Sequence, residues 1–143
     1  MIKSLFIVDD DPITVKICEL VIKNTKFADK ITGFNNGQEC MQFFINCFDK
    51  KDIENNKANI PNLILLDLNM PVMDGWEFLE HFVRKYNNRI PDTKIAILTS
   101  SINPNDFMKA QQYDVIIDFL HKPLLTDLVE DLKLHDALKE YFN

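Results

Sequence analysis

The sequence has no apolar run that approaches the roughly 20 residues needed for a membrane-spanning helix, which excludes an ordinary span. Its N-terminus, MIKSLFIVDDD, turns acidic too soon after a short apolar stretch to be a signal peptide. These absences predict a cytoplasmic protein without a membrane partner. At 143 residues, the chain has the size of one globular domain with a single sizeable core.

Clusters of basic residues are also absent. The chain has 16 Lys and Arg against 22 Asp and Glu, a net charge of -6, and only short basic runs such as Lys50-Lys51. Proteins that bind nucleic acid need clustered Lys and Arg to neutralise phosphates. The charge balance therefore predicts no nucleic-acid partner.

The three cysteines lack the CxxC spacing that is typical of zinc and redox sites. Cys40 and Cys47 are seven residues apart with Phe43 and Phe44 between them, which places them on one helical face. We expect these two residues and Cys18 to be small buried apolar side chains rather than disulfide or metal sites.

Short apolar runs alternate with longer segments of helical period, which is the pattern of a parallel α/β sheet. The predicted strands are residues 5–8, 31–34, 63–66, 95–98 and 116–120. Five strands that alternate with five helices predict a doubly wound sheet in one domain. The polar stretch 49–62 is interpreted as a surface loop or a helix extension.

Three of the predicted helices carry an apolar stripe with the helical period. The stripes are Ile13, Ile17, Leu20 and Val21 after Pro12; Cys40, Phe43, Phe44, Cys47 and Phe48; and Trp76, Leu79, Val83 and Tyr86 after Asp74-Gly75, the last set facing inward. A fourth helix is predicted from about Pro104 to Gln112, and a fifth runs from Pro123 to the C-terminus.

Four of the five predicted strands end on polar, reactive residues. These are Asp9-Asp10-Asp11 after the first strand, Asp67 after the third, Thr99 after the fourth and Lys122-Pro123 after the fifth. In open α/β sheets, ligands bind in the crevice beyond the carboxyl ends of the strands. We therefore expect these side chains to meet at one place.

Asp9, Asp10 and Asp67 would bring three carboxylates into a small space that one lysine cannot neutralise. Like charges at close range raise a pKa or recruit a cation, and Mg²⁺ is commonly held by one or two carboxylates together with phosphate and water. Lys122 would supply a positive charge for a phosphate oxygen, and Thr99 would supply a hydroxyl donor. Together these groups favour phosphoryl transfer to a carboxylate.

Each feature also has a simpler interpretation. The acids before Pro12 could cap a helix, and of the three we assign Asp11 to that role. Asp67 could be an ordinary polar residue at a strand end, and Lys122 could belong to an ordinary turn. The joint placement at strand ends is what favours a common site.

The chain contains the motifs VDDDP at 8–12, LLDLNMPVMDG at 65–75, LTSS at 98–101 and FLHKP at 119–123. In order and spacing they resemble the signature blocks of response-regulator receiver domains, as in the chemotaxis regulator. The resemblance covers about residues 3–130, and we interpret 131–143 as a continuation of the last helix. It implies a flavodoxin-like fold with strand order 2-1-3-4-5 flanked by five helices.

The resemblance implies that Asp67 takes a phosphoryl group from a histidine kinase or phosphotransfer protein, or from a small donor such as acetyl phosphate. It also implies a site for Mg²⁺ or Mn²⁺. Asp10, Asp67 and the backbone carbonyl of Asn69 would bind the ion directly, and Asp9 would hold a metal-bound water.

The same resemblance implies that Thr99 and Lys122 contact the phosphoryl oxygens and that the Lys122-Pro123 peptide bond is cis. Thr99 and Phe119 match the switch pair of the family. Their movement would alter the face formed by the fourth helix, the fifth strand and the fifth helix.

A phosphoacceptor switch rather than an enzyme is therefore expected. Because the chain ends without an output domain, we expect a stand-alone receiver that acts through a downstream protein target. Two features depart from the family pattern. The stretch 49–62 is longer than usual, and Tyr113-Asp114 stands where the family has Gly-Ala.

Two other functions remain open. A haloacid-dehalogenase-like phosphohydrolase also forms an aspartyl phosphate, but it needs a second Asp two residues after the nucleophile, where this chain has Asn69. A receiver-like module that binds partners without phosphorylation usually lacks an acid, the Thr or the Lys, and none is missing here.

The last helix has two apolar faces that lie nearly opposite each other. One contains Leu125, Leu128, Val129 and Leu132, and the other contains Leu134, Leu138, Tyr141 and Phe142. A straight helix on the sheet can bury only the first. Either the chain breaks near 133–135, or the last two turns project and offer an apolar face to a partner or a second copy. We expect the projecting form and a possible homodimer through the last helices.

Overall fold

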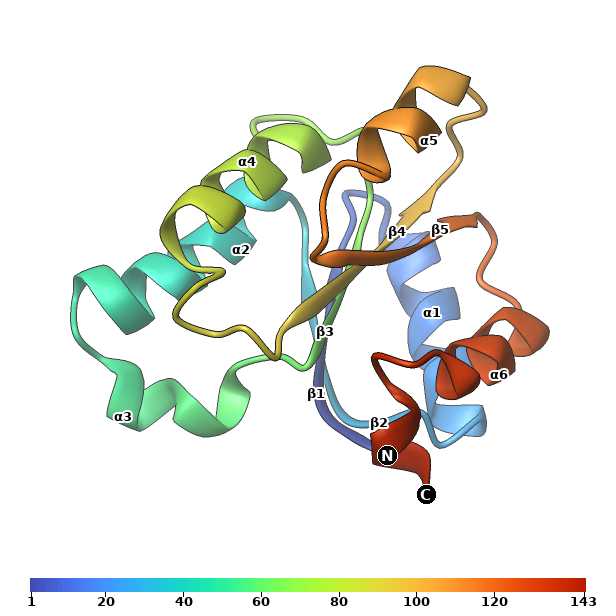
Figure 1. Cartoon of the computed structure of the whole chain (residues 1–143), viewed down its shortest axis with the longest axis horizontal. Coiled ribbons are helices and arrows are strands. Elements are labelled where there is room, and N and C mark those ends of the chain that lie inside the picture. Colours follow the sequence, from blue (N-terminus) through green and yellow to red (C-terminus); the bar gives the residue numbers. More distant parts are fainter.

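The computed structural model describes residues 1–143, except for the side chain of Asn55. A parallel sheet of strand order β2-β1-β3-β4-β5 runs through the centre of the molecule (Figure 1). Its strands are β1 (Ile2–Val8), β2 (Ala28–Phe34), β3 (Leu63–Leu66), β4 (Lys94–Thr99) and β5 (Ile116–His121). The doubly wound, flavodoxin-like fold is confirmed, and every strand contains its predicted range.

Helices cover both faces of the sheet. They are α1 (Pro12–Asn24), α2 (Gly37–Phe44), the short α3 (Ile53–Asn56), α4 (Gly75–Lys85), α5 (Pro104–Ala110) and α6 (Thr126–Leu134). Helices α1 and α6 contact each other on one face, and α2 and α4 contact each other on the opposite face (Figure 1). Within the described chain, no helix has the length and apolar character that crossing a membrane would need.

Each face of the sheet has its own apolar core. Cys40 and Cys47 belong to the core beneath α2 and α4, and Cys18 belongs to the core beneath α1 and α6. All three cysteines are buried and free, as predicted. The central strand β3 is buried at every position, because helices cover both of its faces.

Three of the four residues in the apolar stripe predicted for the first helix do not face the core, and only Val21 packs against it. Ile13, Ile17 and Leu20 are 69%, 41% and 55% exposed, whereas Cys18 and Ile22 are fully buried. Helix α1 is apolar on more than one side, and the sheet can cover only one of them. Helical period alone identified the helix but chose the wrong face.

Residues 45–62 form a series of short helical turns. Helix α2 continues as a π-helix, η1 (Ile45–Asp49), and α3 leads into a 3₁₀ turn, η2 (Lys57–Asn59). Phe48 of the π-helix is buried and stacks on Tyr86 with 5.4 Å between ring centroids. The helix therefore reaches Asp49, the first residue of the stretch 49–62 that was interpreted as a surface loop or a helix extension, and the rest of that stretch contains a separate short helix and a 3₁₀ turn.

The projecting C-terminal helix was a wrong prediction. Helix α6 ends at Leu134, His135 adopts an extended conformation, and the chain folds back into the short 3₁₀ turn η3 (Lys139–Phe142). The stretch 131–143 is thus not one continuous helix. The break at His135 agrees with the other alternative from the sequence, a break of the chain near 133–135.

Folding back brings three of the four residues of the second apolar face, Leu138, Tyr141 and Phe142, against the core of the domain, and leaves Leu134 exposed. Leu138 is 0% exposed, and the ring of Phe142 stacks on Phe27 with 5.2 Å between centroids. The N-terminal ammonium of Met1 donates to the carbonyl of Tyr141 at 2.7 Å, so the two chain ends lie together (Figure 1). Most of the apolar surface that would have supported a homodimer through the last helices is therefore used within the domain.

Replacing Leu138 by Ala should lower the free energy of unfolding by about 2–5 kcal/mol, because it empties a fully buried site. Leu134 provides the matched control: it is 76% exposed, and its replacement by Ala should change stability by no more than about 0.5 kcal/mol. Urea unfolding followed by circular dichroism measures both. Equal effects of the two substitutions would contradict this account of the C-terminal segment.

Candidate functional site

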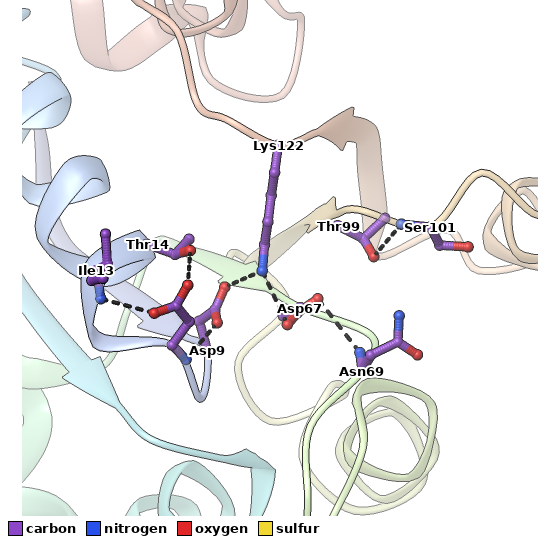
Figure 2. A network of polar contacts seen from close by, with 9 residues as sticks. Asp9, Ile13, Thr14, Asp67, Asn69, Thr99, Ser101 and Lys122 are labelled. Atoms are coloured by element: carbon purple, nitrogen blue, oxygen red, sulfur yellow. Dashed lines mark hydrogen bonds and ion pairs between the residues drawn. The ribbon is translucent and has the colours of Figure 1, made fainter.

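The carboxyl ends of four strands meet at one edge of the sheet (Figure 2). Asp9 follows β1, Asp67 follows β3, Thr99 ends β4 and Lys122 follows β5. Ladder hydrogen bonds continue past the strand ends: the N–H of Asp67 donates to the Val8 carbonyl at 3.0 Å, and that of Lys122 to the Thr99 carbonyl at 2.9 Å. The backbone therefore aligns these residues independently of their side-chain contacts.

Three carboxylates share this edge with one ammonium group. Carboxylate oxygens of Asp9, Asp10 and Asp67 all lie within 4.8 Å of one another. The Lys122 Nζ lies 2.7 Å from Asp9 Oδ2 and 3.2 Å from Asp67 Oδ2 (Figure 2). Asp9 and Asp67 are buried, and Asp10 is exposed. One positive charge among three negative charges leaves the cluster negative.

This donor set fits a hard divalent cation. Such ions prefer carboxylate oxygens, and crowded carboxylates are stabilised when a cation neutralises them. The three acids are close enough to reach one ion. The main chain of Asn69 lies beside them, since its N–H donates to Asp67 Oδ1 at 3.4 Å, and its side chain is exposed.

Burial and charge shift the pKa values of two groups in the cluster. Burial and then the neighbouring Asp9 carboxylate raise the pKa of Asp67, and the contacts with Lys122 and Asn69 only partly offset this. Burial alone would lower the pKa of Lys122, but the hydrogen bond to Asp9 and the charge of Asp67 hold it above its usual value. Lys122 therefore stays charged, and Asp67 is a more basic carboxylate than an ordinary Asp.

Thr99 and Phe119, the expected switch pair, have different surroundings. Thr99 is fully buried, and its Oγ1 accepts a hydrogen bond from the N–H of Ser101 at 3.1 Å, which leaves the hydroxyl proton available. Phe119 is half-buried and meets the rings of Phe107 and His121 edge-on, each at 5.6 Å between centroids. Thr99 thus lies at the strand-end edge, and Phe119 lies beside α5.

Asp11 caps the first helix, as predicted. Its carboxylate accepts hydrogen bonds from the Thr14 hydroxyl at 2.9 Å and from the Ile13 N–H at 3.0 Å, and these bonds lower the pKa of Asp11. The peptide bond between Lys122 and Pro123 is cis.

Gly75 supports the site through a contact that the sequence analysis did not predict. A Cβ at this position would lie 2.3 Å from the Asp67 carbonyl oxygen and 2.8 Å from the Leu68 Cα. The Gly75 N–H also donates to the Leu68 carbonyl at 3.0 Å. The close approach allows α4 to begin directly against the loop that holds Asp67. The Asp-Gly pair in the sequence indicated only that a helix starts there.

The fold and the site define a flavodoxin-like α/β domain with an acidic cluster, a lysine and a buried hydroxyl at the carboxyl edge of its sheet. Residues 5–133 match the model of the response regulator receiver domain, and the chain belongs to this family. It is a receiver domain of the response regulators of two-component signalling. Such domains bind a divalent metal and interact with histidine kinases or phosphotransfer proteins and with downstream effectors.

Individual relatives agree with this assignment. Response regulator Rcp1 from Synechocystis sp. is 27% identical over 113 residues, which cover 79% of this chain and 72% of Rcp1. A two-component response regulator from Cytophaga hutchinsonii superposes with a TM-score of 0.78 at 25% identity, over 96% of this chain and 98% of that chain. The Mn²⁺-bound form of Rcp1 has a TM-score of 0.68 at 26% identity, over 92% and 89%.

In the absence of metal, replacing Asp67 by Asn should raise the free energy of unfolding at neutral pH. The pKa of Asp67 is higher in the folded than in the unfolded state, so the stability of the native chain falls as pH rises through the ordinary Asp value of about 3.9 towards the raised one. A neutral amide avoids this cost, and Lys122 keeps its ion pair with Asp9.

Urea unfolding in EDTA, repeated from about pH 4 to about pH 7, measures the effect across the Asp titration. Replacing Asp114, an exposed acid, by Asn is the matched control and should leave the pH profile unchanged. A variant at Asp67 that is less stable than the native chain at neutral pH would show that the carboxylate is not under electrostatic strain.

Replacing Gly75 by Ala should destabilise the domain by about 1–3 kcal/mol and weaken the binding of Mg²⁺, because the new methyl group must displace the backbone of the Asp67 loop. The control is Gly33→Ala, where the added Cβ would meet only the side chain of Val15, at 3.2 Å. Urea unfolding and calorimetric titration with Mg²⁺ compare the two variants. Normal metal binding by Gly75→Ala would mean that the contact does not shape the site.

Proposed function

We propose that this receiver domain is a Mg²⁺-dependent phosphoacceptor in a His-to-Asp phosphorelay and that Asp67 is the residue that becomes phosphorylated. The observation that carries the proposal is the position of the Asp67 carboxylate. It lies 3.2 Å from the Lys122 ammonium and within 4.8 Å of the carboxylates of Asp9 and Asp10. Asp67 is thus a basic nucleophile between a fixed cation and two potential metal ligands.

In the proposed reaction, a carboxylate oxygen of Asp67 attacks the phosphorus of a phosphohistidine. The new O–P bond forms as the P–N bond breaks, and the electron pair leaves with the imidazole, which takes up a proton. With acetyl phosphate, acetate is the leaving group. Because its pKa is raised, the Lys122 ammonium stays positive and can pair with the phosphoryl oxygens. The Thr99 hydroxyl can donate a hydrogen bond to the same phosphoryl group.

The proposed direct metal ligands are Asp10, Asp67 and the main chain of Asn69, and Asp9 would hold a metal-bound water. A bound Mg²⁺ or Mn²⁺ would neutralise the charge that gathers on the carboxylates and the phosphoryl group. The Mn²⁺-bound form of the relative Rcp1 supports a divalent ion here.

Replacing Asp10, which is exposed, by Asn should weaken Mg²⁺ binding by about tenfold or more, because it removes one of the three carboxylates of the cluster. Calorimetric titration with Mg²⁺ measures the change.

The proposed output is a change in partner binding. The Thr99 hydroxyl would move towards the phosphoryl group, and Phe119 would respond at the face that β5 shares with α5. The donor would be a histidine kinase or a phosphotransfer protein. The downstream partner would be a protein that discriminates the two states of this face.

Incubation with acetyl phosphate and Mg²⁺, followed by intact-protein mass spectrometry, tests the proposal. The native chain should gain the mass of one phosphoryl group, and EDTA or the substitution Asp67→Asn should abolish the gain. Asp114→Asn removes an exposed carboxylate outside the cluster and should label normally.

The competing function is a receiver-like module that binds partners without phosphorylation. It predicts no adduct on the native chain with acetyl phosphate, phosphoramidate or a phosphorylated histidine donor, although Mg²⁺ still binds. An adduct that persists in Asp67→Asn would instead move the acceptor to another residue.

A further inference from the structure

The carboxylate of Asp106, in the first turn of α5, joins the loop between β4 and α5 to the start of α4. The Ser101 hydroxyl, from the loop between β4 and α5, donates to Asp106 Oδ2 at 2.5 Å. The Trp76 indole N–H, from the start of α4, donates to Asp106 Oδ1 at 3.2 Å. Each oxygen of the Asp106 carboxylate thus accepts a hydrogen bond, and the two donors come from different segments of the chain.

On one side, this connection reaches Thr99. The N–H of Ser101 donates to Thr99 Oγ1 at 3.1 Å, and the Ser101 hydroxyl that binds Asp106 also accepts from the N–H of Asn103 at 3.2 Å (Figure 2 shows the Thr99–Ser101 bond). Ser101 therefore fixes the orientation of the Thr99 hydroxyl with its backbone, while its side chain is held by Asp106.

On the other side, the connection reaches the Asp67 loop. Trp76 directly follows Gly75, whose backbone packs against the carbonyl of Asp67. The Lys109 Nζ lies 4.6 Å from the centre of the Trp76 ring, and the ring of Tyr113 stacks on it at 6.2 Å. These contacts hold the indole on α5, so a displacement of α5 or of the Asp67 loop changes its environment.

We propose that Asp106 is a positioning residue that holds the end of β4, where Thr99 lies, close to the start of α4 beside the Asp67 loop, and that it links the state of Thr99 to Trp76. Hydrogen bonds to a carboxylate are roughly twice as strong as those between neutral groups, so two such bonds can hold the two segments together. The role in phosphoryl transfer rests on the proposed function. The physical link between Ser101 and Trp76 does not.

The link can be tested without phosphorylation, because the chain has a single tryptophan and hence one indole N–H resonance. Ser101→Ala removes the hydroxyl donor but retains the backbone N–H that binds Thr99. The indole resonance should shift, although Ser101 bonds to Asp106 rather than to the indole. Ser101→Thr retains a hydroxyl and should restore the native resonance. Asp114→Asn is the control and should leave it unchanged.

The positioning role is tested by the rate of labelling with acetyl phosphate at saturating Mg²⁺. Asp106→Ala should slow labelling by about tenfold, because the Thr99 hydroxyl is then free to move away from the phosphoacceptor Asp67. Its affinity for Mg²⁺ should stay native, since the acids of the cluster and the contact of Gly75 with the Asp67 carbonyl are both unchanged. The double variant Ser101→Ala, Asp106→Ala should be no slower than Asp106→Ala alone, because both changes break the same bridge.

An unchanged indole resonance in Ser101→Ala would show that the bridge does not exist in solution. A native labelling rate in Asp106→Ala, or an equal loss of Mg²⁺ affinity, would overturn the positioning role. Failure of the native chain itself to label would count against the proposed function, and the indole resonance would still decide whether the bridge is present.

Discussion

The ion pairs that Lys122 makes with Asp9 and Asp67 are the interaction on which the rest of the site depends. Lys122 follows an edge strand, whereas the two acids follow neighbouring central strands. A single ammonium therefore contacts acids from two other strand tips and lowers the repulsion between two buried carboxylates. Because Asp10 adds a further negative charge, the compensation is incomplete, and a divalent cation would complete it.

This incomplete compensation links stability to function. Burial and the charge of Asp9 raise the pKa of Asp67, so its ionised form costs stability in the metal-free protein. Under the proposed function, the same environment would make Asp67 a better nucleophile and bring it close enough to the other acids to share a metal ion. The sheet tolerates the cost because its two apolar cores and its ladder hydrogen bonds fix the strand tips independently of the charges. Strain of this kind is common where a protein keeps a reactive group.

Sequence patterns predicted the strands well because each run is short and bounded by polar residues, and the runs of β1, β3 and β4 are buried on both faces. They did less well for helices. Periodicity placed Ile13, Ile17 and Leu20 on one stripe, but only the position of the sheet shows that this stripe faces outward. At the C-terminus, two opposed apolar faces indicated a conflict without deciding it. In the structure, α6 ends at Leu134 and the chain turns back so that Leu138 packs into the core.

By itself, the sequence determined the alternation of strands and helices, the reactive residues at four strand ends and the motifs of the receiver family, since all of these are local features of the chain. Only the tertiary structure decided how those residues face one another: Lys122 between two acids, Gly75 against the Asp67 carbonyl, and Asp106 between Ser101 and Trp76. Several of these contacts join residues that are far apart in sequence, such as Lys122 and Asp67 or Trp76 and Asp106. Their geometry depends on strand register and helix packing, which no local pattern encodes.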